Sequence, residues 1–217
     1  AMVRAVCDRA HELGFTVAAH VESTEGVRVA LEGGVDSIEH GAAPTDDIMG
    51  LFKKNGSFLC TTISPALPYA LFDRSVSCAS EVEQYNGNMV FEGIIANSKA
   101  ALEQGVPVAL GNDVGCPWIT QYDFWRELRY FEKYVGVSRS FALHAATLRN
   151  AQLAGIGDVT GSIEVGKDAD MIVVDANPLD DLCALRTPKH VIHRGRLIAK
   201  PNVKRNAVVD RELDKFL

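Results

Sequence analysis

Apolar residues in the first half of the chain alternate between helical spacing and short continuous runs. Val3, Val6 and Ala10 recur every three or four residues, which predicts a helix that ends at Gly14. Four short apolar runs, each typical of a strand buried on both faces, follow at residues 15–20, 35–40, 57–62 and 106–111. Helical stripes separate them and end at glycines. This alternation predicts an α/β fold with a parallel sheet or barrel.

One connection in this pattern is longer than a strand-to-helix turn requires. The third run leads into a long stretch that contains Pro65, Pro68, Tyr69 and Phe72 and precedes a helix that ends at Gly105. We therefore expect a long loop here, and loops of this size on such scaffolds are usually functional.

The pattern changes after the fourth run. Helical spacing covers residues 122–134 and 138–154, with a helix cap expected at Thr147. Beyond it, residues 161–170 are expected to form a strand and tight turn, residues 171–175 a strand, and residues 190–198 a hairpin that turns at Arg194 and Gly195. A small all-β appendage is thus predicted on an α/β body.

Composition excludes several classes of protein. The 217 residues are 47% hydrophobic and 23% charged, which is ordinary for a globular protein. The net charge of −6 and the lack of any basic run argue against a nucleic-acid partner. No apolar run is long enough for a membrane span, and no signal peptide is recognisable. The five cysteines are scattered and are expected to be reduced, so we expect a cytoplasmic location.

Polar side chains follow three of the predicted strands. His20, His40 and Asp113 stand at their carboxyl ends, where neighbouring parallel strands aim side chains into one shared mouth. Two imidazoles and a carboxylate suit zinc, and the carboxylate can also accept a proton from water during catalysis. A lone histidine at a strand end is more often only hydrogen-bonded. The repetition over two strands favours a metal site, with Asp113 also catalytic.

Three further side chains are candidates for binding a small-molecule substrate. Arg74 and Tyr69 lie in the long connection, where Arg74 could form a bidentate pair with a carboxylate. Trp118, just beyond Asp113, could cover an apolar part of the substrate. A solvated loop and ordinary packing remain the alternatives for these residues.

Five sequence motifs, taken together and in order, resemble the metal-dependent amidohydrolase superfamily. They are AAH at 18–20, GVDSIEHG at 34–41, LGND at 110–113, ATLRNA at 146–151 and GSIEVGKDAD at 161–170. The branch that the chain resembles contains imidazolonepropionase-like proteins and dipeptidases that cleave Xaa-Pro substrates. The resemblance extends over essentially the whole chain.

The resemblance implies a (β/α)₈ TIM barrel with a small β-sandwich built from both chain ends. In that family one or two divalent metal ions are held by a His-x-His pair of strand 1, a carboxylated lysine or glutamate of strand 4, histidines of strands 5 and 6, and an aspartate of strand 8. By position, His20 would be the strand 5 ligand, His40 the strand 6 ligand and Asp113 the strand 8 ligand and proton carrier. A metal-bound hydroxide would attack an amide or cyclic amide carbonyl.

The chain departs from the family in one respect, because it contains no His-x-His pair. Its four strands would be strands 5 to 8, so residues 1–155 would form half of the barrel and residues 156–217 the C-terminal part of the β-sandwich. We therefore expect a fragment of a zinc-dependent hydrolase of dipeptides, N-acyl amino acids or imidazolone-like substrates, with weak activity on its own.

Two other interpretations stay open. A half-barrel leaves sheet edges exposed, so the chain could be a non-catalytic protein that forms a homo-oligomer or associates with a missing half through those edges. A complete doubly wound α/β domain is disfavoured, because no glycine-rich phosphate loop follows any strand.

Overall fold

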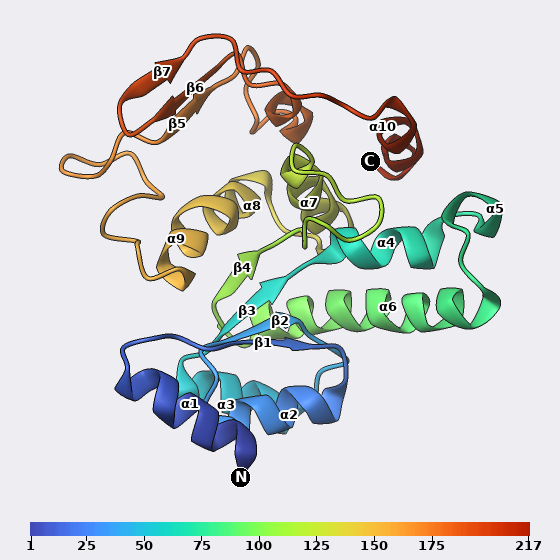
Figure 1. The fold of residues 1–217 in the computed structure, drawn as a ribbon, viewed down its shortest axis with the longest axis vertical. Helices are drawn as coiled ribbons and strands as arrows, with labels where there is room; N and C mark the ends of the chain where they lie inside the picture. Colours follow the sequence, from blue (N-terminus) through green and yellow to red (C-terminus); the bar gives the residue numbers. More distant parts are fainter. The chain divides into compact units, whose positions relative to one another are not determined.

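Four short strands build the central sheet of the first half of the chain in the computed structural model, which describes all 217 residues (Figure 1). The strands are β1 (Ala18–Val21), β2 (Ser37–His40), β3 (Phe58–Thr61) and β4 (Val108–Leu110). They pair in parallel and in chain order. The predicted α/β fold with a parallel sheet is confirmed.

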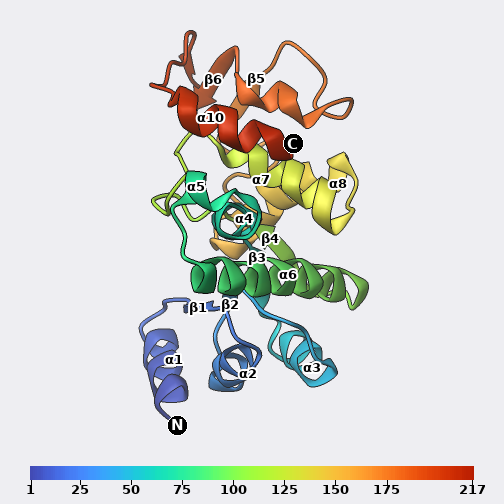
Figure 2. The same ribbon diagram turned by 90° about the vertical axis from the view of Figure 1, so that its right-hand side faces the viewer.

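One helix precedes the first strand and five more lie between the strands. They are α1 (Met2–Glu12), α2 (Thr24–Gly33), α3 (Asp46–Asn55), α4 (Ile63–Leu71), α5 (Arg74–Ser77) and α6 (Glu81–Glu103). Figures 1 and 2 show α1, α2 and α3 side by side on one side of the sheet. Ser23 caps α2 by accepting a hydrogen bond from the Gly26 amide, and Gly34 ends it in the left-handed conformation.

The core of this sheet forms along one row of paired residues. Ala19 pairs with Ile38, Ile38 with Leu59, and Leu59 with Val108. Ile38 and Leu59 have no exposed surface. The edge strand β1 is different, because its residues are exposed or half-buried. The register of this row decides which side chains meet at the ends of the strands.

The expected long loop is wrong, because most of the stretch from Pro65 to Phe72 belongs to helix α4. Pro65 lies in the first turn, where a backbone N–H has no partner within the helix, and Pro68 is tolerated inside it. Packing against α6 overrides the local preference. A Cβ atom added to Gly87 of α6 would lie 2.5 Å from the Cβ of Tyr69. Tertiary contact thus stabilises a helix that the spacing alone did not indicate.

Residues 112–217 form a second compact unit, separate from the first at residues 1–111. Its helices are α7 (Phe124–Tyr130), continued by a π-helical turn to Val135, α8 (Arg139–His144), continued by a π-helical turn into α9 (Asn150–Leu153), and α10 (Ala207–Leu213). Its strands β5 (Met171–Val173), β6 (His190–His193) and β7 (Arg196–Ile198) form an antiparallel sheet. The domain boundary after residue 155 stays a prediction.

The β-rich segment is partly as predicted. The hairpin turns at Arg194 and Gly195, both with positive φ. The strand expected within residues 161–170 is absent, because Gly161 and Gly166 adopt φ angles of 92° and 96° that break an extended chain. Lys167 instead closes a loop, since its Nζ donates to the carbonyl oxygen of Gly157 and to the hydroxyl of Ser162.

The cap expected at Thr147 is also wrong. The helical segment runs through this residue without a break. Its hydroxyl donates to the carbonyl oxygen of Leu143 one turn earlier, which is the other common use of a threonine hydroxyl in a helix.

A buried ion network links α7 to α10 within the second unit. The Arg126 side chain is 1% exposed and its guanidinium contacts Asp123 at 3.1 Å, Asp210 at 3.0 Å and Asp214. Burial by itself would lower the pKa of Arg126, but the bond to Asp214 and the neighbouring carboxylates raise it. Burial raises the pKa of Asp214, but the contacts with Arg126 and Arg186 lower it further, so the net shift is downward.

No helix of the structure combines the length and hydropathy needed to cross a bilayer.

Candidate metal site

The two histidines predicted as ligands meet at the carboxyl end of the parallel sheet. His20 lies near the end of β1, and His40 is the last residue of the neighbouring strand β2. The Nδ1 atom of His20 lies 2.7 Å from the Nε2 atom of His40. The rings meet edge to face, with centroids 4.5 Å apart. One nitrogen of each ring therefore faces the same small space.

Glu22 completes the cluster. Possible ligand atoms of His20, Glu22 and His40 all lie within 4.8 Å of one another. Glu22 follows His20 by two residues, and alternate residues of an extended chain point to the same side. This spacing is a signal in the sequence, but Glu22 was not among the predicted ligands. His20 and Glu22 are exposed, whereas His40 is buried.

The backbone at the end of β2 is bent sharply. His40 has a φ of 69° and Gly41 a φ of 88°. A Cβ atom on Gly41 would lie 2.3 Å from the Nδ2 atom of Asn97, which is fully buried in α6. A histidine in the left-handed region costs conformational energy, so the surrounding packing must hold it there. The glycine lets α6 approach closely enough to do so.

The donor set fits a borderline divalent cation. Zinc accepts imidazole nitrogens and carboxylate oxygens, and here two ring nitrogens and one carboxylate converge. The second ring nitrogen of His40 is already bound, because its Nδ1 atom is within hydrogen-bond distance of the Thr62 hydroxyl. The ring orientation is thus fixed on both sides, as is usual for histidine ligands.

The other predicted site residues are placed as follows. Asp113 lies in the loop after β4, exposed and with a φ of 49°, and belongs to the second unit. Trp118 is half-buried in the same unit. In the first unit, Tyr69 is half-buried on α4, and Arg74 lies exposed on α5 with its Nε donating to the carbonyl oxygen of Ala79. The roles of these residues in substrate or metal binding stay predictions.

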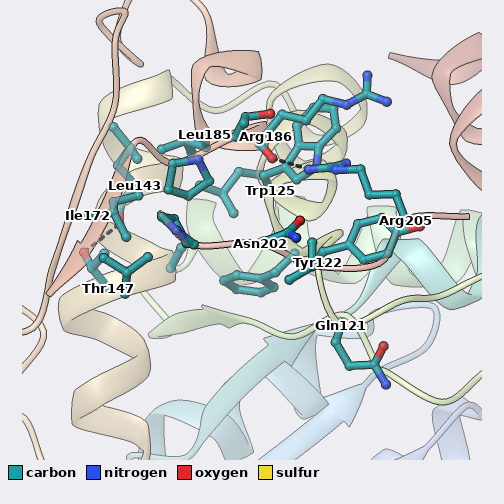
Figure 3. A pocket seen from close by; sticks show the side chains of 18 residues that line it. Gln121, Tyr122, Trp125, Leu143, Thr147, Ile172, Leu185, Arg186, Asn202 and Arg205 are labelled. Carbon is teal, nitrogen blue, oxygen red and sulfur yellow. Dashed lines mark hydrogen bonds between the residues drawn. The ribbon is translucent and has the colours of Figure 1, made fainter. Parts of the chain in front are cut away.

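The second unit contains a cavity of about 520 Å³ that includes none of the predicted site residues. Figure 3 shows Trp125 and Tyr122 among its lining residues, with the Arg205 side chain passing over Tyr122. The Arg205 guanidinium carbon lies 4.8 Å from the centre of the Tyr122 ring, and an Nη atom donates to the carbonyl oxygen of Arg186. The lining is otherwise mainly apolar.

The fold is thus an α/β fold with a parallel sheet, and two histidines and a glutamate come together at the carboxyl end of that sheet. Residues 1–198 match the model of the amidohydrolase family, and the chain belongs to this family. Members of the family related to the chain are hydrolytic enzymes. The resemblance in the motifs is confirmed by this match.

Several known proteins are similar to the chain. Ochratoxinase of Aspergillus niger is 26% identical over 207 residues, covering 93% of this chain and 42% of that protein. Imidazolonepropionase of Symbiobacterium thermophilum is 26% identical over 212 residues, covering 95% and 42%. The chain therefore spans about half the length of the curated relatives that it matches.

Solved structures are also similar to the chain over about half of their length. A protein of Bifidobacterium longum assigned as a prolidase superposes with a TM-score of 0.95 at 42% identity, covering 98% of this chain and 54% of that one. An Xaa-Pro dipeptidase with bound methionine superposes with a TM-score of 0.80 at 33% identity, covering 91% and 48%.

Proposed function

We propose that the chain is part of a metal-dependent hydrolase of amide bonds, with a divalent cation, zinc by the chemistry of the donors, held by His20 and His40. The observation that carries this proposal is the convergence of His20 Nδ1 and His40 Nε2 at 2.7 Å beside the Glu22 carboxylate. Family membership supports the same chemistry.

Each residue would have a defined task. His20 and His40 would hold the cation, and Glu22 would provide an oxygen beside it. Asp113 is proposed as a further ligand and as the proton carrier, because it occupies the position of the strand 8 aspartate in the family pattern. A divalent cation at such a site polarises an amide carbonyl and activates water for its hydrolysis.

We infer the substrate class from the relatives and from three side chains. The similar structures include a dipeptidase that acts on Xaa-Pro, and the relatives include an imidazolonepropionase. Dipeptides, N-acyl amino acids and imidazolone-like cyclic amides share an amide beside a carboxylate-bearing group. Arg74 and Tyr69 are proposed to bind such a carboxylate and Trp118 an apolar part. In this proposal residues 1–155 correspond to strands 5 to 8 of a (β/α)₈ barrel and residues 156–217 to part of a β-sandwich.

Zinc affinity tests the proposal directly. Zinc should bind the chain with a stoichiometry of one, as measured by competition with a chromophoric chelator. His20→Ala and His40→Ala should each weaken binding at least about 100-fold, because each removes a ligand rather than a supporting group. His193→Ala is the matched control, since His193 is exposed on β6 and bonded to Asp170. Equal affinity in all four proteins would contradict the proposal.

A second candidate function, assembly without catalysis, is favoured by the open edges of the sheet. β1 pairs only with β2, and β4 only with β3. An unpaired strand edge offers backbone hydrogen bonds to another strand. In this case the chain would form a homo-oligomer or associate with a complementary half. Light scattering of the isolated chain distinguishes the two, because a stable monomer that binds zinc would exclude assembly as its role.

A further inference from the structure

Thr62 contacts the buried side of His40 and is the feature from which we go beyond the proposed function. Its hydroxyl lies within hydrogen-bond distance of His40 Nδ1. Thr62 is 3% exposed and His40 is 5% exposed, so the bond is shielded from water. The opposite ring nitrogen, His40 Nε2, faces His20 and Glu22. The two contacts lie on opposite sides of one imidazole.

The Thr62 hydroxyl does not cap helix α4, although Thr62 is at the N-cap position. Thr62 is the N-cap residue of α4, and a threonine there usually accepts a hydrogen bond from an amide of the first turn. No such bond forms in this helix. The hydroxyl thus contacts His40 instead of capping the helix.

The other substituent of Thr62 explains why the hydroxyl has this direction. A Cβ atom on Gly111 would lie 3.1 Å from the Cγ2 atom of Thr62, so the methyl group occupies the space that a side chain at Gly111 would need. A β-branched side chain has few accessible χ1 angles. With the methyl group against Gly111, the hydroxyl is directed at His40.

We propose that Thr62 is a positioning residue that fixes the tautomer of His40, and this inference rests on the proposed metal site. The hydroxyl oxygen of Thr62 accepts the Nδ1–H of His40. A neutral imidazole carries one N–H, so Nε2 keeps a lone pair that is directed at the cluster, where Nε2 lies 2.7 Å from His20 Nδ1. Only that nitrogen can then bind a cation. Without this acceptor, the proton of a neutral imidazole favours Nε2, which would block the site.

The tautomer can be observed directly. Long-range ¹H–¹⁵N correlation spectra of the metal-free chain distinguish a protonated Nδ1 from a protonated Nε2 in His40. The unmodified chain should show the proton on Nδ1. A proton on Nε2 would overturn the proposal without the need for any variant.

Two substitutions then separate hydrogen bonding from packing. Thr62→Val keeps the shape and removes the hydroxyl, whereas Thr62→Ser keeps the hydroxyl. We expect Thr62→Val to shift His40 toward the Nε2–H form and to weaken zinc binding about 10- to 100-fold. Thr62→Ser should keep the Nδ1–H form, with zinc affinity within about threefold of the unmodified chain.

The outcomes distinguish this inference from the proposed function. A Thr62→Val chain that keeps both the Nδ1–H form and its zinc affinity would show Thr62 to be a packing residue only and would overturn the inference. A tautomer shift in a chain that never binds zinc would support the positioning role and would overturn the metal site. Melting curves by circular dichroism confirm that the compared variants are folded.

Discussion

The two units of the chain each contain a cluster of polar side chains. The clusters differ in whether their charges and electron pairs find partners within the protein. In the first unit His20, Glu22 and His40 converge at the exposed end of a sheet, and all three can donate electron pairs to a cation. In the second unit Arg126 is 1% exposed and is surrounded by aspartates. The second cluster neutralises its own charge inside the protein. In the proposed function, the first is completed by a cation.

This difference separates a stabilising network from a proposed binding site. A buried charge must be paired, because an unpaired one costs several kcal/mol. The Arg126 network meets that requirement with Asp123 and Asp210, both almost buried. At the strand ends, in contrast, His40 is buried and in hydrogen-bond contact with Thr62, whereas His20 is exposed. One side of the cluster is thus rigid and the other is open to a ligand.

The largest expected effect is on the second unit. Arg126→Met removes the nearest cation from the buried carboxylates of Asp123 and Asp210 and should lower the free energy of unfolding by about 3–5 kcal/mol, because the contacts that remain, the Thr120 hydroxyl at Asp123 and Arg186 and Arg205 at 3.7 Å from Asp210, do not replace it. Both tryptophans of the chain, Trp118 and Trp125, belong to this unit, so their fluorescence during urea unfolding reports on it.

Arg196→Met is the control for this change, because Arg196 is exposed on β7. It should change stability by less than about 0.5 kcal/mol. If the two variants were equally stable, the network around Arg126 would not stabilise the second unit, and the contrast between the two clusters would fail.

A smaller effect is expected at the backbone bend of His40 and Gly41, next to the proposed metal site. Gly41→Ala places a Cβ atom 2.3 Å from Asn97 Nδ2 and requires a φ of 88° that alanine adopts poorly. We expect a loss of about 2–3 kcal/mol in stability and weaker zinc binding, because His40 is displaced. Urea unfolding by circular dichroism and chelator competition measure the two effects.

Gly50→Ala is the matched glycine in the same unit. It lies in α3 with no atom within 4 Å of an added Cβ, so alanine should leave stability unchanged or raise it by up to about 1 kcal/mol. Zinc affinity should not change. Weakened zinc binding by Gly50→Ala as well would contradict a specific role for the Gly41 bend.

The smallest expected effect is on how the stability of the second unit depends on pH. The pKa of Asp214 is lowered in the folded protein, because the contacts with Arg126 and Arg186 outweigh burial. A lowered folded pKa stabilises the protein at pH values above the unfolded pKa of about 4, and this stability is lost as the pH falls through the folded pKa. Asp214→Asn should therefore be less stable at pH 7 and should lose less stability between pH 5 and pH 3.

Asp8→Asn on α1 is the comparison, since Asp8 is exposed and belongs to the first unit. Tryptophan fluorescence at a series of pH values gives the unfolding midpoint of the second unit. An identical acid dependence in the unmodified chain and Asp214→Asn would show that the ion network does not set it.

Much of the first unit could be predicted because its signals are local. The apolar runs and the glycines after each helix indicated the four strands, and Gly34 and Gly56 end helices in the left-handed conformation. Helix α4 escaped prediction because its stability comes from contact with α6, whose Gly87 lies close to Tyr69. The loop at residues 161–170 was mistaken for a strand because its glycine backbone angles are not visible in apolar spacing.

In the candidate site too, local signals predicted some residues, whereas tertiary contacts placed the others. Spacing along the chain was enough to put His20 and His40 at the ends of parallel strands, since strand and helix periodicity depends on neighbouring residues. Only the fold could bring His20 and Glu22 next to His40 and place Thr62 against the opposite side of the His40 ring. Those contacts depend on the register between strands and on the packing of Thr62 against Gly111, which join residues about 20 to 50 positions apart and leave no periodic trace in the sequence.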